Sequence, residues 1–572
     1  MSAIDSVTAG RIRTSHQIFN LPFPRNRFFT GREDILKGIH ASFNGGETVQ
    51  ALTGLGGIGK TQTALEFAYR YRQNYQVVLW GNAHSRETLV TDFVSMAGLL
   101  NLPEKNAQDQ GQAVDAVKRW LENNTGWLLI LDNADDLALA REFIPSGETG
   151  RVLLTTRAQY LGEVAARNAV KKMEPEEGAL FLLRKKGTLK KDESLESAPS
   201  EIRNQAETLS KKLDGLPLAL DQAAAFIGEM QTSIEGYLSL YETERAALLS
   251  HRGALTQGHP PVTVTFSLAF SKVADASPEA ADLLRVCAFL EAESIPEEIF
   301  SEGGKELGEV LGSIAESPLK LARAIGEAGR FSLLQPNPEE KTLSLHRLVQ
   351  EVLRSEMGEE IKRVWAERAV RAVNAVFPDV EFSNWKACSR LTPHAQALLA
   401  SIKEYGIETE EAARILNQAG YYLRQRAQYV DAEPLFRNAL EISERSFGPD
   451  HSKVGTHLNN LAQLLKDTNR LAEAEPLMRR SLEIDERSFG PEHPNVGIDL
   501  NNLALLLKDT NRLAEAEPLM RRQAEIFEKS LVPGHPYIAV SLRNYAGLLR
   551  AMNREEEAEE LEALAAEKED AV

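Results

Sequence analysis

The stretch GLGGIGKT, from Gly54 to Thr61, places four glycines ahead of a lysine and a threonine. It follows the apolar run TVQALTG and precedes the stretch TQTALEFAYRYRQ, which has helical periodicity. Glycines allow backbone amides to turn towards phosphate oxygens, and a helix N-terminus adds positive potential. The ammonium group of Lys60 would reach the β- and γ-phosphates of a nucleotide, while the Thr61 hydroxyl would hold Mg²⁺. The alternative, a glycine-rich turn without a ligand, is disfavoured by the strand before it and the helix after it. We expect nucleotide contacts from Gly54, Leu55, Gly56, Gly57, Ile58, Gly59, Lys60, Thr61 and Gln62.

A second candidate site follows the apolar run WLLILD, which ends in Asp132. A carboxylate at the end of a buried strand is a suitable magnesium ligand. The next residue, Asn133, can orient a water molecule but cannot accept its proton. Asp135 is a candidate substitute acid, and Arg157, which ends the run RVLLTTR, is a candidate sensor of the γ-phosphate. The alternatives are a helix-capping role for Asp132 and an ordinary surface position for Arg157.

These residues need a scaffold, and the sequence around them alternates between strand and helix patterns. TVQALTG, VVLW, WLLILD and RVLLTTR predict strands, and ETLVTDFVSMAGLL and QAVDAVKRWLEN predict helices. Such alternation predicts a parallel sheet covered on both faces. The following part, residues 174–370, reads mostly as helices, with a short β segment at GRFSLLQ and TLSLHRL and an exposed loop at 185–200.

The C-terminal part is repetitive. Leu416, Leu458, Leu500 and Leu542 recur every 42 residues, and KDTNRLAEAEPLMRR occurs twice without change. A fixed period of this size predicts a solenoid. Small and apolar residues fall at the spacing of tetratricopeptide helix pairs, and the turn SFGPDH with its copy SFGPEH accounts for the length beyond about 34 residues. HEAT and armadillo repeats share the period but not this spacing. The acidic final block predicts a polar cap.

Composition narrows the classes of protein further. The 572 residues carry a net charge of −18, which disfavours broad nonspecific binding to nucleic acid. The two cysteines, Cys287 and Cys388, lie far apart, so we expect no disulfide framework and a reducing, cytoplasmic location. No apolar run approaches the roughly 20 residues of a membrane span, and the N-terminus does not read as a secretory signal.

Several motifs together resemble those of STAND-class P-loop ATPases, specifically the NB-ARC branch with C-terminal tetratricopeptide repeats of the kinesin light chain kind. FFTGRE resembles the motif that lies against the base and sugar, with Gly31 and Arg32 at the matching positions. DGLPLAL resembles the helical-domain motif, and its Pro217 would pack near the adenine. LSLHRLVQEVLR resembles the winged-helix motif, and its His346 would contact the β-phosphate of ADP. Taken alone, Pro217 could be a helix-start proline and His346 a buried core histidine.

The resemblance implies a multidomain α/β and all-α architecture: a P-loop sheet domain, a helical domain, a winged helix and a tetratricopeptide solenoid. The expected boundaries are an N-terminal arm (1–27), a P-loop domain (28–172), a helical domain (173–255), a winged-helix domain (256–360), a helical linker (361–410) and a repeat sensor (411–572). Family members carry an effector domain ahead of the nucleotide domain. We expect here that the arm acts itself, that a separate effector protein is recruited, or that the chain is truncated.

The expected function is a signalling ATPase switch, similar to NLR proteins of innate immunity, that binds ATP or ADP with Mg²⁺ and hydrolyses slowly. A protein or peptide ligand on the repeats would release an ADP-locked state, and the chain would then form a homo-oligomer. The alternatives are an interaction scaffold with a structural nucleotide and a STAND-class transcription regulator. The motif around His346 departs from the family, because Arg347 stands where an aspartate is common. The ADP lock through that acid is therefore in doubt.

The recurring LNNLA places Asn459, Asn460, Asn501 and Asn502 off the apolar stripe of their helices. Carboxamides can hydrogen-bond an extended peptide backbone, as in similar kinesin light chain repeats, so we expect these asparagines to line a ligand groove. Inheritance through recent duplication explains them equally well. Likewise, arginines in the identical copies either favour an acidic ligand or pair with nearby glutamates. We expect no membrane partner and no nucleic-acid partner.

Overall fold

The computed structural model describes residues 17–252, 260–532 and 535–570, so most of the predicted N-terminal arm lies outside the described residues. The chain divides into two compact units. The first comprises Met1–Ala281, Gly326–Gln335 and His346–Val352, and the second comprises Asp282–Ile325, Pro336–Leu345 and Leu353–Val572. Among the described residues, no helix combines the length and apolarity needed to cross a membrane.

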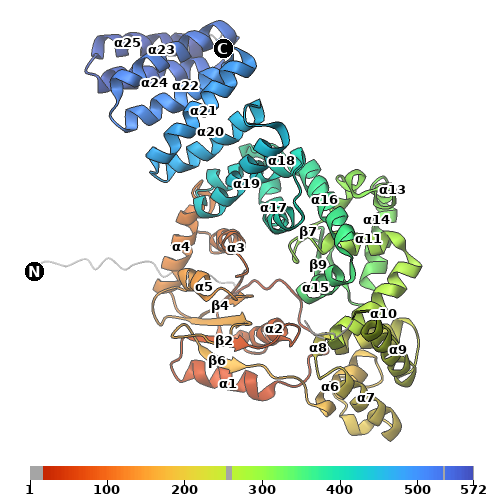
Figure 1. Ribbon diagram of the computed structural model, residues 1–572. Helices are drawn as coiled ribbons and strands as arrows, with labels where there is room; N and C mark the ends of the chain where they lie inside the picture. The colour runs from red at the N-terminus through yellow and green to blue at the C-terminus, as the bar shows by residue number, and fades with distance from the viewer. Residues whose placement is uncertain (1–16, 253–259, 533–534, 571–572) are drawn as a thin grey trace, which may run out of the picture. The chain divides into compact units, whose positions relative to one another are not determined.

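The first unit contains a six-stranded sheet in the order β1-β3-β4-β5-β2-β6. Figure 1 labels three of these strands, β2, β4 and β6. The strands of the sheet all run parallel, as the alternation of strand and helix patterns predicted. The strands are β1 (Ile18–Phe19), β2 (Val49–Thr53), β3 (Val77–Asn82), β4 (Trp127–Asp132), β5 (Arg151–Thr156) and β6 (Ala166–Ala169). The carboxyl ends of β2, β3, β4 and β5 therefore share one edge, where ligands bind in open α/β sheets.

Helices cover both faces of this sheet. Alternate side chains of a strand point to opposite faces, so side chains on both sides of the central strands are buried. One face packs with α3 (Arg86–Leu99), α4 (Gln110–Asn123) and α5 (Leu137–Phe143) around Leu79, Leu129 and Leu154. The other face carries α2 (Lys60–Arg70), which contacts α1 (Glu33–Asn44) through Phe67 and Phe43, with ring centroids 5.8 Å apart. Burial on both faces explains why the central strands read as continuous apolar runs.

A group of helices follows the sheet within the first unit. It comprises α6 (Pro175–Lys185), α7 (Ser200–Lys212), α8 (Pro217–Glu229), α9 (Ile234–Arg252) and α10 (Pro260–Ala276). The predicted exposed loop lies between α6 and α7, where the structure adds one 3₁₀ turn at Leu195–Ser197. Farther along, β7 (Ile295–Pro296), β8 (Leu334–Asn337) and β9 (Thr342–Leu345) form a three-stranded sheet in the order β7-β9-β8. The expected segment TLSLHRL contains β9, whereas GRFSLLQ overlaps β8 only at its last two residues. Helix α15 (Arg347–Glu356) follows β9.

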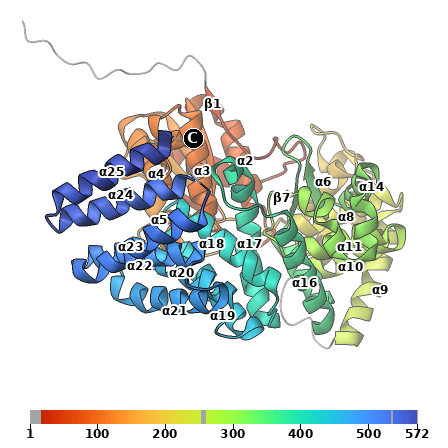
Figure 2. The same ribbon diagram turned by 90° about the horizontal axis from the view of Figure 1, so that it is seen from above.

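In the second unit, α16 (Glu359–Val376) and α17 (Trp385–Tyr405) precede four helix pairs among the described residues (Figure 2). The pairs are α18 (Glu410–Gln425) with α19 (Tyr429–Phe447), α20 (Ser452–Asp467) with α21 (Leu471–Phe489), α22 (Pro494–Asp509) with α23 (Leu513–Ser530), and α24 (Pro536–Ala551) with α25 (Glu555–Asp570). We call the first helix of each pair its A helix. The two helices of the first pair approach closely at Gly420, where a Cβ atom would lie 3.1 Å from the Phe436 ring.

The turn SFGPDH and its copy SFGPEH explain the extra length of the first two repeats. Helices α19 and α21 each extend to 19 residues and end before Gly448 and Gly490, whose φ values are 87° and 88°. The preceding phenylalanine stacks on the following histidine, at 4.9 Å for Phe447–His451. That histidine then accepts a hydrogen bond at Nδ1 from the backbone N–H of Lys453 and so caps the next helix. The longer helix, the glycine and the histidine cap together account for the 42-residue period.

Candidate nucleotide site

The loop Gly54–Thr61 connects β2 to α2 at the carboxyl edge of the sheet. Gly57 and Gly59 have φ values of 71° and 90°, in the left-handed region that a side chain disfavours. The Lys60 ammonium group donates to the backbone oxygens of Gly54 and Leu55, both at 2.9 Å. Burial lowers the pKa of Lys60, although the charges of Asp135 and Asp132 oppose that shift. The sequence therefore places a partly desolvated cation inside a glycine loop at a helix N-terminus.

Asp132 receives two hydroxyl groups at the end of β4. Thr61 Oγ1 donates to its carboxylate oxygens at 3.0 and 3.1 Å, and Thr155 Oγ1 donates to Oδ1. The side chain is 3 % exposed, and burial raises its pKa against these hydrogen bonds. A carboxylate and hydroxyls are hard oxygen donors of the kind that Mg²⁺ prefers, and a cation here would offset the cost of the buried charge. The residues present thus fit a magnesium ion bound with a polyphosphate.

Asn133 and Asp135, the two candidate residues for positioning water, lie in different environments. Asn133 follows Asp132 with φ 58°, a conformation that asparagine tolerates, and its backbone N–H donates to Thr155 Oγ1 at 3.0 Å. Asp135 accepts from the backbone N–H and from Nε of Arg157, both at 2.6 Å. Burial would raise the pKa of Asp135, but these hydrogen bonds and the Arg157 charge outweigh it and lower the pKa. A carboxylate held in this way is a weak base.

Elements far away in the sequence reach the glycine loop within the first unit. The backbone N–H of Leu218 donates to the Gly57 oxygen at 3.3 Å, and the Pro217 ring lies 3.9 Å from where a Gly59 Cβ would stand. A Leu348 methyl group lies 3.7 Å from the corresponding position on Gly57. Sequence reasoning placed Pro217 near the nucleotide, and the structure brings it beside the loop. It missed Leu218 and Leu348, for which apolar character was the only signal.

The motif around Gly31 and Arg32 lies against α6. A Cβ on Gly31 would collide with the Glu177 carboxylate, and Arg32 has φ 67°. Burial lowers the pKa of Arg32, and its Nη2 atom is buried without a hydrogen-bond partner. An unpaired buried guanidinium nitrogen costs free energy, so this atom fits a polar group of a ligand.

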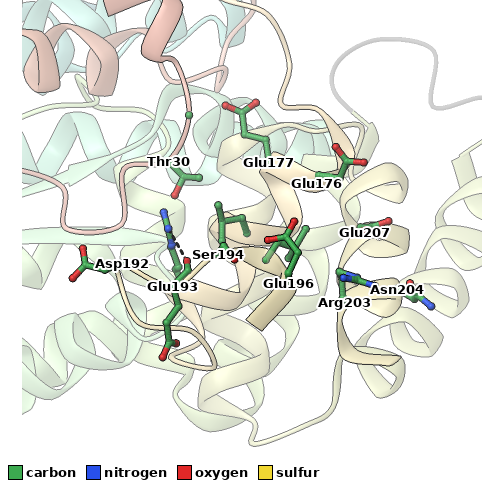
Figure 3. Close-up of a pocket in the computed structure, with 14 residues that line it drawn as sticks. Thr30, Glu176, Glu177, Asp192, Glu193, Ser194, Glu196, Arg203, Asn204 and Glu207 are labelled. Atoms are coloured by element: carbon green, nitrogen blue, oxygen red, sulfur yellow. Dashed lines mark hydrogen bonds between the residues drawn. The ribbon is translucent and has the colours of Figure 1, made fainter. Parts of the chain in front are cut away.

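A hollow of about 700 Å³ opens beside the same motif (Figure 3). Its lining comes from Thr30 and Gly31, from α6, from the loop after α6 and from α7. Six acidic side chains face two arginines there, and no residue of the glycine loop takes part. The acid majority disfavours a polyphosphate. We therefore place the candidate nucleotide site at the glycine loop and not in this hollow.

His346 is exposed, so it is not a buried core histidine. Its Nδ1 accepts a hydrogen bond from the Leu348 backbone N–H at 3.2 Å, and the ring thereby caps the start of α15. The side chain of the same Leu348 lies beside Gly57 of the glycine loop. Arg347, the residue after His346, approaches His84 Nδ1 with its Nη1 at 2.5 Å. His84 follows the end of β3, and no sequence signal pointed to it.

The asparagines of the repeats form a ladder between successive A helices. Each second asparagine donates through Nδ2 to the first asparagine of the preceding repeat, 43 residues earlier. The Nδ2–Oδ1 distances are 3.0 Å for Asn460–Asn417, 3.1 Å for Asn502–Asn459 and 2.9 Å for Asn544–Asn501. The ladder gives these residues a structural role within the solenoid. Their role as ligand contacts stays a prediction. The arginines of the identical copies pair with glutamates, as in Arg479–Glu475 and Arg480–Glu444.

Several known proteins and protein families are similar to parts of this chain. A family model described as tetratricopeptide repeat matches residues 411–487, 454–522 and 500–567, and one described as a domain of unknown function (DUF7779) matches 271–362. A protein of Hyaloscypha variabilis named nucleotide-binding leucine-rich repeat (NLR)-like protein is 28% identical over 467 residues, covering 74% of this chain and 45% of that protein. Regulatory protein AfsR of Streptomyces coelicolor is 26% identical over 271 residues, covering 45% of this chain and 26% of that protein.

Among solved structures, a Pyrococcus horikoshii STAND protein with a tetratricopeptide repeat sensor matches with a TM-score of 0.48 and 17% identity, over 96% of this chain and 78% of that one. The chain spans less than half the length of the curated relatives it matches. Four helix pairs of the described chain and the repeat model confirm the predicted solenoid. The chain carries a tetratricopeptide repeat domain behind a six-stranded parallel sheet and is similar over 74% of its length to a protein named NLR-like, in line with the resemblance that its motifs suggested.

Proposed function

We propose that this chain is a nucleotide-gated signalling switch that binds ADP or ATP with Mg²⁺ at Gly54–Thr61. One observation carries the proposal: two distant elements reach Gly57, in the middle of the phosphate loop. The Leu218 backbone N–H donates to the Gly57 oxygen at 3.3 Å, and a Leu348 methyl group lies 3.7 Å from where a Gly57 Cβ would stand. A change in bound phosphate at that loop is therefore felt directly by α8 and by the start of α15. A simple structural nucleotide would not need such contacts.

Each site residue then has a defined task. The loop amides and Lys60 hold the phosphates, Thr61 and Asp132 hold the magnesium ion, and Arg32 faces the nucleoside. The ion would neutralise charge on the phosphate oxygens. Asn133 orients water without accepting its proton, and Asp135 stays paired with Arg157, so hydrolysis is slow. Slow hydrolysis suits a switch, because the ATP-bound state then persists long enough to signal.

The repeats supply the input. A protein or peptide that binds the A helices would favour one nucleotide state, and the nucleotide domains would then assemble into a homo-oligomer. Such a ligand must bind the active state about 10⁴-fold more tightly to shift the population from 1:99 to 99:1. The nucleotide is tested by releasing and identifying the nucleotide held by purified protein, with calorimetry on the stripped chain.

Lys60→Ala should abolish nucleotide retention, because it removes the cation at the phosphates. Lys37→Ala, on the exposed face of α1, is the matched control and should retain the nucleotide. Unsubstituted protein that holds no adenine nucleotide and binds none by calorimetry would defeat the proposal.

The likeness to regulatory protein AfsR favours a second candidate function, control of transcription by the same switch. Specific binding to duplex DNA with affinity that falls steeply as salt rises would support it. The net charge of −18 places any such contact on a local surface.

A further inference from the structure

The end of β3 is tied to the magnesium-site strand through Asn82. The Cα atoms of Asn82 and Asp132 are register partners in the sheet. The Ala83 backbone N–H donates to the backbone carbonyl oxygen of Asp132 at 2.6 Å. The Oδ1 atom of Asn82 accepts from the His84 backbone N–H at 3.2 Å and from Asn133 Nδ2 at 3.4 Å. The residue that replaces the second acid is thereby connected to the loop that carries His84.

His84 in turn meets the start of α15 within the first unit. Arg347 Nη1 lies 2.5 Å from His84 Nδ1. Arginine is always protonated in proteins and can only donate. In this contact His84 Nδ1 is therefore the acceptor. The neighbouring Leu348 has a methyl group 3.7 Å from where a Gly57 Cβ would stand. Two adjacent residues of α15 therefore lie beside two parts of the candidate site: the phosphate loop and the loop after β3.

We propose that Arg347 and His84 form a latch that holds the start of α15 against the loop after β3, beside the candidate nucleotide site. The proposal rests on the proposed nucleotide switch and names a part of its regulation. Asn133 connects the candidate magnesium ligand to the latch. Its backbone follows Asp132, and its carboxamide donates a hydrogen bond to Asn82, so a shift at Asp132 would move the loop that carries His84. Arg347 and His84 act as positioning residues and touch no phosphate.

The test measures release of a fluorescent ADP analogue from the full-length protein. His84→Ala and Arg347→Ala should each speed release about tenfold, since either removes a hydrogen bond to a charged group. Their combination should release no faster than the faster single variant. His84→Asp should release more slowly than His84→Ala, because a carboxylate pairs with Arg347. Arg86 lies two residues after His84 and forms an exposed ion pair with Glu142. Arg86→Ala is the control, and it should leave the release rate unchanged.

Hydrogen exchange of the backbone amides of residues 348–350 gives a second readout. It should quicken in His84→Ala and Arg347→Ala even without nucleotide, and not in Arg86→Ala. Nucleotide uptake with unchanged release in both alanine variants would overturn the latch alone, as would equal release from His84→Asp and His84→Ala. No uptake by the unsubstituted chain would overturn the proposed function and the latch together.

Discussion

Thr155 uses its hydroxyl group twice at the candidate metal site. It donates to Asp132 and accepts from the Asn133 backbone N–H, and the residue is only 1 % exposed. Thr155→Val keeps the shape of the side chain but leaves a buried carboxylate and an amide each short of a partner. We expect it to lower the free energy of unfolding by about 1–3 kcal/mol. Denaturant unfolding monitored within the sheet domain measures this, with Thr155→Ser as the matched control. Equal stability of the valine and serine variants would contradict it.

Asn133 directly follows Asp132, the position at which the resemblance implies a second acid that activates water. Asn133→Asp keeps a side chain that tolerates the left-handed φ of 58° and supplies a proton acceptor. We expect ATP hydrolysis to rise by about tenfold or more, which general-base catalysis can provide. Single-turnover phosphate release measures it, and Asn133→Ala serves as the control that lacks both amide and acid. A rate in Asn133→Asp no higher than in Asn133→Ala would show that the position does not act on the water.

At this scale Lys60 and Thr61 could be proposed from one local motif and Asp132 from the end of an apolar run, and the structure joins Thr61 to Asp132 by a hydrogen bond. Their role at a nucleotide stays a prediction. His84 could not be proposed from the sequence, since it lies 263 residues from Arg347 and only folding brings them together. Asp135 was proposed as a substitute acid on position alone. The structure pairs it with Arg157, an interaction that no spacing rule specifies.

Helices α21 and α22 bury two carboxyl groups at their contact. Asp485 and Asp499 are 5 % and 3 % exposed, while the matching pair one repeat earlier is Ser443 and His457, joined at 2.9 Å. Burial, together with the Asp485 charge, raises the pKa of Asp499 to about 8, and burial raises that of Asp485 to about 6. The folded repeats therefore keep a proton that the unfolded chain releases above about pH 4.

It follows that this site makes the repeats less stable as pH rises from about 4 to 8, after which the effect levels off, with a slope of at most ~1.4 kcal/mol per pH unit per proton. Asp499→Asn mimics the protonated acid and should make the stability of the repeats less dependent on pH. The variant should therefore be more stable than the unsubstituted chain, by a margin that grows towards pH 8. Hydrogen exchange of the α21 and α22 backbone amides, measured during thermal unfolding at several pH values, reports this stability. Asp509→Asn, at the exposed end of α22, is the control and should keep the dependence. An identical pH profile for all three proteins would refute the assignment.

Elements with strong periodicity were predictable, and short or edge elements were not. The runs at β2, β3, β4 and β5 are apolar because both faces of the sheet are covered. Strand β6 reads ARNA and strand β1 has two residues, so neither carries an apolar run, and each is set by pairing with a neighbour. The asparagine ladder was likewise hidden, because its 43-residue offset becomes visible only when A helices lie side by side.

At the scale of the whole molecule, the switch predicts that assembly depends on the terminal phosphate. With ADP the purified chain should have the mass of a monomer, 63.3 kDa. With a nonhydrolysable ATP analogue and a cell extract that supplies the repeat ligand, a defined multiple of that mass should appear, because both inputs favour the same state. Mass photometry separates these species, and Lys60→Ala should stay monomeric under every condition. Identical mass with ADP and with the analogue, in the presence and absence of extract, would instead support an interaction scaffold whose nucleotide only stabilises the fold.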